Sequence, residues 1–186
     1  VGSEMCIRDS DFASKNDITE NEYFEMIKNK TAVLIGCSFM FGGIVAEAND
    51  LNTNLLYEIG LNLGIAFQLE DDLLDCFGDQ EKFGKKIGGD IIEKKKTLLY
   101  LFTKSKLESE KKLEFENVFN SNEIAESEKI NSIKLFYETS GALKYVKNKV
   151  KVYFDKADQL INKLELDNDT KRKLNQFSKT LLNREI

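Results

Sequence analysis

Histidine, proline and tryptophan are all absent from the 186 residues of this chain. Without histidine there is no imidazole, so His-based catalytic triads, histidine metal sites and imidazole acid–base chemistry are excluded. Without proline no helix is interrupted at a proline, and few segments show the alternation of a strand. We therefore expect an all-α fold whose chemistry depends on Asp, Glu, Lys and neutral polar groups.

Cysteine is scarce, and the three residues (Cys6, Cys37 and Cys76) have no metal-site spacing. Two of them lie in apolar helical surroundings, so we expect reduced cysteines in a cytoplasmic protein. The net charge of −5 gives no nucleic-acid or anionic-membrane footprint. The uncharged run 31–46 has 16 residues, fewer than the roughly 20 of a transmembrane helix. We expect a buried core helix there and no transmembrane segment.

An acidic stripe follows in GIAFQLEDDLLDCFGDQEKFGKKIGGDIIEKKK, residues 64–96. The mostly apolar background from Leu55 to Phe77 predicts a helix. At about 100° per residue, one arc of roughly 100° holds Gln68, Asp71, Asp72 and Asp75. Most of the remaining circumference is apolar, as in a buried helix, so we expect the stripe to face an internal cleft. Gly60 and Gly64 precede it on the same side and would leave room there.

Three carboxylates in one stripe must be neutralised by protonation or by a cation. Two of them about 5 Å apart repel by roughly 3 kcal/mol at an effective dielectric of about 20. Aspartate oxygens suit a hard ion such as Mg²⁺, which keeps several waters and binds phosphate oxygens. Glycines permit a tight loop downstream, and six lysines follow: Lys82, Lys85, Lys86, Lys94, Lys95 and Lys96. Acids beside lysines indicate Mg²⁺ with diphosphate, whereas an isolated DDxxD would favour a solvated helix end.

Two segments carry a resemblance to a known family. FQLEDDLLD followed by FGKKIGGDIIEKKKT resembles the second aspartate-rich region of the trans-isoprenyl diphosphate synthases, the polyprenyl synthetase family. YFEMIKNKTAVLIG, residues 23–36, is similar to the Lys-Thr helix of that family. The resemblance extends from Asp11 to Arg184 and covers the C-terminal half of the family. It implies an all-α isoprenoid synthase helical bundle, here truncated.

The resemblance also implies a role for individual residues. Lys30, Lys85 and Lys95 would bind diphosphate, and Asp90 would orient Lys85. Thr31 and Gln68 would place oxygens where positive charge develops on the allyl group. Asp71 would ligate Mg²⁺, with Asp72 and Asp75 holding its waters or ligating directly. Lys86, Lys94 and Lys96 are expected to be solvated.

The implied reaction is the condensation of an allylic diphosphate with isopentenyl diphosphate by an Mg²⁺-dependent prenyltransferase of isoprenoid biosynthesis, a homodimer in its full-length form. Residues 1–10, VGSEMCIRDS, are hypothesised to be a sequencing-adapter artefact, and residues 11–186 to be the C-terminal part of one polyprenyl synthetase domain. The family's first aspartate-rich motif is not found here, so we expect this fragment to be inactive alone.

Two alternatives remain open: a class I terpene cyclase, and a non-catalytic helical subunit of a heteromeric synthase. A cyclase usually carries an NSE-type second motif, whereas this chain has DDLLD, and a scaffold has no need of the acids and lysines. Leu73 departs from the aromatic residue common in the family, a mild packing change.

Other elements can be placed by their caps and periodicity. Thr19 and Glu22 predict a capping box, and residues 49–54 predict a turn. Residues 97–105 predict an apolar helix, and 109–127 and 130–164 predict amphipathic helices. Asp167 or Asn168 is expected to cap a last helix that runs to Leu182.

Overall fold

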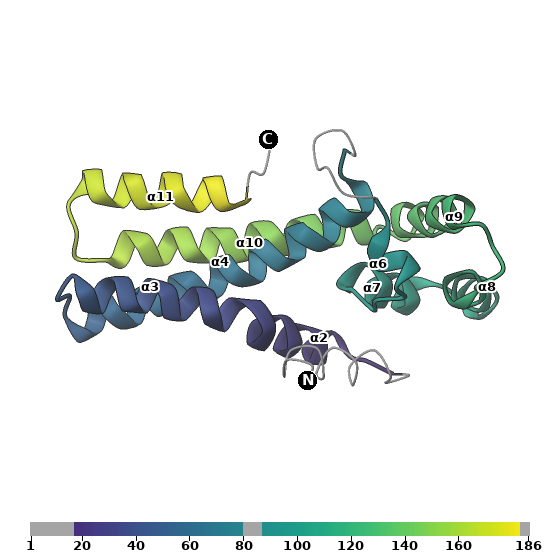
Figure 1. Ribbon diagram of the computed structural model, residues 1–186, viewed down its shortest axis with the longest axis horizontal. Helices are drawn as coiled ribbons and strands as arrows, with labels where there is room; N and C mark the ends of the chain where they lie inside the picture. Colours follow the sequence, from purple (N-terminus) through teal and green to yellow (C-terminus); the bar gives the residue numbers. More distant parts are fainter. Residues whose placement is uncertain (1–16, 80–86, 183–186) are drawn as a thin grey trace. The chain divides into compact units, whose positions relative to one another are not determined.

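The computed structural model describes residues 17–79 and 87–182. Residues 1–10, together with Lys82, Lys85 and Lys86, lie outside the described residues. The described part contains helices and no strand, which confirms the all-α prediction. The helices described along the chain are α2 (Glu20–Ile27), the π-helical turn η1 (Lys28–Ala32), α3 (Val33–Val45), α4 (Asp50–Phe77), α6 (Gly89–Ile92), α7 (Leu98–Lys106), α8 (Ser109–Asn120), α9 (Glu126–Thr139), α10 (Ala142–Lys163) and α11 (Asn168–Leu182). Figure 1 labels the α-helices among them.

The chain divides into two compact units. Unit 1 comprises Val1–Tyr23 and Asp71–Lys147, and unit 2 comprises Phe24–Glu70 and Asn148–Ile186. Unit 1 therefore contains α6 to α9 with the last turns of α4, and unit 2 contains α3 and α11 with the first part of α4 and the later part of α10.

Helix caps agree with the sequence at two of the predicted places. The Thr19 N–H donates to Glu22 Oε2 over 2.9 Å, and the Glu22 N–H donates to Thr19 Oγ1 over 3.2 Å, which confirms the capping box. Asp167 Oδ1 accepts from the Thr170 N–H over 3.0 Å at the start of α11. The predicted turn at 49–54 is wrong, because Asn49 Oδ1 accepts from the Asn52 N–H over 2.8 Å and α4 already begins at Asp50.

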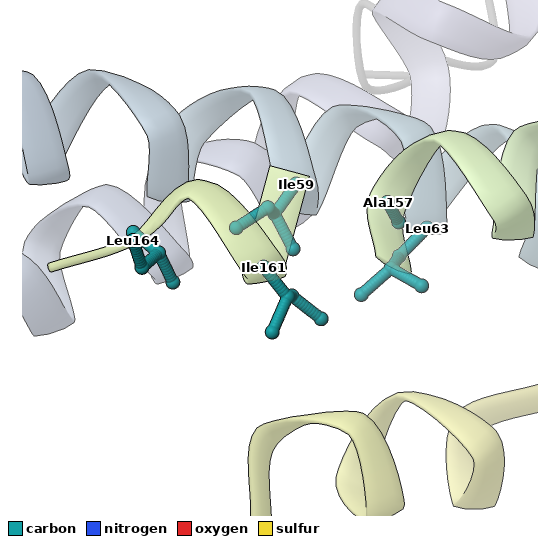
Figure 2. Packing of buried hydrophobic residues seen from close by; sticks show 5 residues of the cluster. All are labelled: Ile59, Leu63, Ala157, Ile161 and Leu164. Carbon is teal, nitrogen blue, oxygen red and sulfur yellow. The ribbon is translucent and has the colours of Figure 1, made fainter. Parts of the chain in front are cut away.

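Unit 2 has a core between α4 and α10. Ile59 and Leu63 of α4 pack with Ala157, Ile161 and Leu164, as Figure 2 shows. All five side chains are at most 2% exposed, and Leu174 and Leu181 of α11 pack against the same cluster. These residues follow the helical spacing read from the sequence.

Helix α3 is not the buried core helix that its uncharged sequence predicted. Leu34, Phe41 and Val45 are 71%, 59% and 84% exposed, whereas the buried positions of the helix are Gly36 and Gly43. Gly36 and Gly43 lie against α4, and Phe39 packs against the cluster of Ile59 and Leu63, whereas Leu34, Phe41 and Val45 are exposed. Among the described helices, none is long and apolar enough to cross a membrane.

Glycines allow α4 to approach η1 and α3 closely. A Cβ at Gly60 would lie 2.7 Å from Gly36 Cα, and one at Gly64 would lie 2.5 Å from Ala32 Cα. The room that Gly60 and Gly64 were expected to leave is thus taken by the neighbouring helix. The same contact brings the Lys-Thr segment against the turns of α4 that precede Gln68.

Unit 1 is held by aromatic contacts among its short helices. The ring of Tyr100 of α7 lies tilted against those of Phe115 and Phe119 of α8, with ring centroids 5.3 and 4.4 Å away. Phe115 also meets Phe136 of α9 edge-on at 5.4 Å. These rings pack the helices beside the turn that follows the acidic stripe.

Candidate functional site

The three aspartates of the stripe lie on the last turns of α4, in unit 1. Asp71 and Asp75 are partly buried, and Asp72 is 6% exposed. Gln68 lies one turn earlier on the same helix, as the sequence predicted. Burial of a carboxylate is costly unless hydrogen bonds or cations compensate it, so the partners of each aspartate decide what it can do.

Asp72 is bonded to a buried tyrosine. The Tyr23 hydroxyl donates to Asp72 Oδ2 over 2.6 Å, and Tyr23 is only 1% exposed. Burial, and then the charge of Asp72, raise the pKa of Tyr23 well above its ordinary value. Tyr23 therefore stays protonated and acts as a hydrogen-bond donor to the carboxylate.

Asp75 closes the turn that follows the stripe. Its main-chain carbonyl accepts from the Gly88 N–H over 2.7 Å, and its Oδ2 accepts from the Asp90 N–H over 2.9 Å. A Cβ at Gly89 would lie 3.1 Å from Asp75 Oδ1, so a residue without a side chain suits this close approach. Burial raises the pKa of Asp75, and the bond from Asp90 N–H opposes that rise.

Asp90 and Lys95 form an ion pair on this turn. Lys95 Nζ lies 2.7 Å from Asp90 Oδ1 and 2.9 Å from Glu93 Oε2. Although burial lowers it, the bonds to Asp90 and Glu93 raise the pKa of Lys95 overall, so this ammonium stays charged. Asp90 was expected to orient Lys85, which lies outside the described residues, and in the structure its carboxylate holds Lys95.

Lys94 and Lys96 were expected to be solvated charges, and both are partly exposed in the structure. Lys94 has a left-handed backbone, φ +56°, and its Nζ donates to the Asn120 carbonyl over 2.7 Å and to Asn122 Oδ1 over 2.6 Å. Both bonds are exposed, so they do not contradict the expected solvated charge, and they place the ammonium at the carbonyl end of α8, where cations are favourable. Lys96 is partly buried, and that burial lowers its pKa.

The Lys-Thr segment lies in unit 2 on an unusual turn. Residues Lys28–Ala32 form the π-helical turn η1, in which the Val33 N–H bonds to the Lys28 carbonyl. Single π-turns inside helices occur often at functional sites. Thr31 Oγ1 donates to Gln68 Oε1 over 2.9 Å, so two residues predicted to act together are in contact. Lys30 is partly buried.

The donor set fits a divalent cation without forming a closed cage. Among residues 17–79 and 87–182, no three His, Cys, Asp or Glu side chains are grouped so as to hold a metal ion by themselves. Mg²⁺ seldom needs such a group, because it commonly uses one or two carboxylates and takes waters and phosphate oxygens for the rest. Aspartates already oriented by Tyr23 and by the Asp90 N–H fit that type of site.

Sequence reasoning missed Tyr23, Glu93 and Lys94 as polar partners of this region. Tyr23 precedes Lys30 by seven residues, or two helical turns. In a regular helix this spacing places both residues on the same face, so the sequence did contain a signal for Tyr23. The sequence KKK cannot show that Lys94 and Lys95 have different partners, because the left-handed backbone of Lys94 is a feature of the structure alone.

Comparison with known proteins shows which family this all-α chain belongs to. The family model described as Polyprenyl synthetase matches residues 5–136. The chain belongs to the polyprenyl synthetase family. This confirms the resemblance on which the site residues were chosen.

Individual relatives agree with that assignment. The geranylgeranyl diphosphate synthase of Saccharolobus solfataricus is 37% identical over 171 residues, covering 92% of this chain and 51% of that protein. A crystal structure of geranylgeranyl pyrophosphate synthase matches with a TM-score of 0.89 at 39% identity, covering 98% of this chain and 57% of that one.

A second solved structure has informative ligands. The crystal structure of polyprenyl synthase from Caulobacter crescentus CB15, complexed with calcium and isoprenyl diphosphate, matches with a TM-score of 0.85 at 28% identity. The match covers 98% of this chain and 55% of that one. The chain thus spans about half the length of the curated relatives it matches.

Proposed function

We propose that this chain is part of a prenyltransferase that condenses an allylic diphosphate with isopentenyl diphosphate and so elongates an isoprenoid chain. The observation that carries the proposal is the arrangement in unit 1, where Asp75 of α4 accepts from the Asp90 N–H and Asp90 in turn holds Lys95. Family membership and relatives named geranylgeranyl diphosphate synthase support it. Residues 11–186 would form the C-terminal part of one polyprenyl synthetase domain.

The metal in this proposal is Mg²⁺, held through Asp71, with Asp72 and Asp75 binding it directly or through its waters. When bound, the ion supplies positive charge that stabilises the departing diphosphate. The relative complexed with calcium and isoprenyl diphosphate supports a divalent ion together with a diphosphate in this family. Hard oxygen donors of the kind found on α4 suit either ion.

Lysines complete the binding of the substrate's diphosphate. We assign this role to Lys30 and Lys95, and to Lys85, which lies outside the described residues. Lys95 remains an ammonium because Asp90 and Glu93 stabilise its charge, so it can offer N–H donors to phosphate oxygens. Asp90 then positions the Lys95 ammonium. That Asp90 also orients Lys85 stays a prediction.

Thr31 and Gln68 are assigned to the allylic part of the substrate. Ionisation leaves positive charge on the allyl group, and hydroxyl and amide oxygens can stabilise it without charge of their own. The bond from Thr31 to Gln68 fixes both side chains, so their oxygens are held before the substrate binds. Isopentenyl diphosphate then attacks the allylic carbon, and loss of a proton gives the longer chain.

The full-length form is proposed to be a homodimer located in the cytoplasm. Cys37 and Cys76 carry free thiols, and burial raises the pKa of Cys76, so that this thiol stays protonated. Reduced cysteines of this kind agree with that location.

The test is incorporation of labelled isopentenyl diphosphate by the complete gene product, read from genomic DNA, with an allylic diphosphate and Mg²⁺. Elongated product that depends on isopentenyl diphosphate supports the proposal. Product formed from the allylic diphosphate alone would indicate a terpene cyclase instead. Absence of any product, with diphosphate release also absent, would indicate a non-catalytic subunit.

A further inference from the structure

The bond between Tyr23 and Asp72 joins two buried polar groups that are 49 residues apart in the chain. Tyr23 is 1% and Asp72 is 6% exposed, so water has little access to either. The O–O distance of 2.6 Å falls in the range of hydrogen bonds from a hydroxyl to a charged carboxylate. A bond of this kind is stronger and more directional than one between neutral groups.

The tyrosine hydroxyl is itself anchored from a second side. The backbone of Leu98, the first residue of α7, is hydrogen-bonded to Tyr23. Tyr23 therefore links the start of α7 to the acidic end of α4 within unit 1.

The consequence concerns the orientation of Asp72. A carboxylate can rotate about its Cβ–Cγ bond, and a donor fixed on Oδ2 removes that freedom. The direction in which Oδ1 points is then set by the protein before any ligand arrives. Preorganised groups bind more tightly because less ordering is left to the binding step.

We propose that Tyr23 is a positioning residue, whose hydroxyl holds the Asp72 carboxylate in the orientation that binding of a divalent cation with diphosphate requires. The inference rests on the proposed function and extends it to a residue outside the acidic and lysine-rich motifs. Tyr23 acts through Asp72 and touches neither metal nor substrate.

Tyr137 offers a matched control. It is a second tyrosine of unit 1 that is 1% exposed, and its hydroxyl makes no hydrogen bond to an aspartate in the part of the chain that the structure describes. Tyr23→Phe and Tyr137→Phe each remove one hydroxyl from a buried ring. Only the first change removes a donor from the acidic stripe.

The experiment titrates Mn²⁺ into the full chain in the presence of inorganic diphosphate and follows free Mn²⁺ by electron paramagnetic resonance. Tyr23→Phe should weaken Mn²⁺ binding by roughly 10-fold, the effect of one hydrogen bond to a charged group. Tyr137→Phe should change it by less than about twofold. Circular dichroism checks that each variant is folded.

If the Tyr23→Phe variant does not fold, a comparison of D72N with the double variant Y23F/D72N still tests the inference. Asp72→Asn removes the charge, so the double variant Y23F/D72N contains no buried charge that has lost the tyrosine donor. If Tyr23 acts only through the Asp72 carboxylate, the double variant binds Mn²⁺ as D72N does. A further loss in the double variant would overturn the inference.

Other outcomes separate this inference from the proposed function. Equal Mn²⁺ binding by wild type and Y23F, or equal losses in Y23F and Y137F, would overturn the inference alone. A wild-type chain that binds no Mn²⁺ with diphosphate would overturn the metal site of the proposed function and this inference with it.

Discussion

Asp75 shows how a residue of the proposed metal site can also fix a turn. It accepts hydrogen bonds from Gly88 through its carbonyl and from Asp90 through Oδ2, so it fixes the turn that presents Lys95. In sequence it is simply the last acid of DDLLD. Its role in the turn could not be predicted from sequence, because the group that donates to Asp75 Oδ2 is the backbone N–H of a residue fifteen positions further along the chain.

Substitution of Asp75 separates these two contributions. Asp75→Ala removes the acceptor for the Asp90 N–H and should lower the free energy of unfolding by about 1 kcal/mol. Asp75→Asn keeps an oxygen acceptor of the same size, so its loss should be less than half as large. Urea unfolding of the three proteins measures the difference. Equal losses in both variants would contradict the role of this bond.

Lys129 provides a test at alkaline pH. It is 3% exposed, donates to the Ser121 carbonyl over 3.0 Å, and its pKa is lowered by burial and then by the charge of Lys94. The folded chain thus releases this proton before the unfolded chain, whose lysine titrates near 10.5. Between the two pKa values the unfolded state binds more protons, so the free energy of unfolding rises with pH.

Lys129→Met removes this contribution. Wild type should gain stability relative to the variant as pH rises from neutral towards 10.5. Urea unfolding of both proteins at several pH values gives the two curves, and subtraction cancels the titration of the other lysines and tyrosines. Parallel curves over the whole interval would show that burial does not disfavour the charge of Lys129.

At the scale of elements, we could predict the helices that show capping residues or an apolar periodicity in the sequence. The capping box at Thr19 and the cap at Asp167 mark α2 and α11, and α4 follows its apolar pattern. The exposure of α3 was not predictable, since apolar composition does not show which faces neighbours cover. The π-helical turn at Lys28–Ala32 also has no compositional signal, although Lys30 and Thr31 lie on it.

The turn before α6 depends on Gly88. Its φ is +83°, a left-handed value that costs an L-residue roughly 1 kcal/mol, and an added Cβ would lie 2.7 Å from the Ile130 side chain. Gly88→Ala should therefore lower the free energy of unfolding by about 1–2 kcal/mol. Thermal or urea unfolding measures this loss.

Gly42 serves as the control for that substitution. It lies in α3, and an added Cβ there meets nothing within 4 Å. Gly42→Ala should leave stability unchanged or raise it by about 0.5–1 kcal/mol, the helix preference for alanine. If Gly88→Ala were tolerated as well as Gly42→Ala, the left-handed turn would not be a constraint on the fold.

At the scale of the whole molecule, the family could be inferred from sequence because its two motifs are contiguous stretches. The individual partners inside the site could not, because they join distant segments such as Tyr23 with Asp72, or Thr31 with Gln68. Residue type indicates which chemistry is available. Only the fold determines which of these groups come into contact.

The central claim is that the acidic stripe of α4 makes this a metal-dependent prenyltransferase of its family. The most direct measurement is the rate of elongation with labelled isopentenyl diphosphate and Mg²⁺, using the complete gene product as wild type, Asp71→Ala, and Asp155→Asn as an exposed-acid control on α10. We expect Asp71→Ala to lose at least about 100-fold in rate, as for removal of a group that stabilises transition-state charge, and Asp155→Asn to match wild type. An Asp71→Ala protein that elongates as fast as wild type would contradict the account.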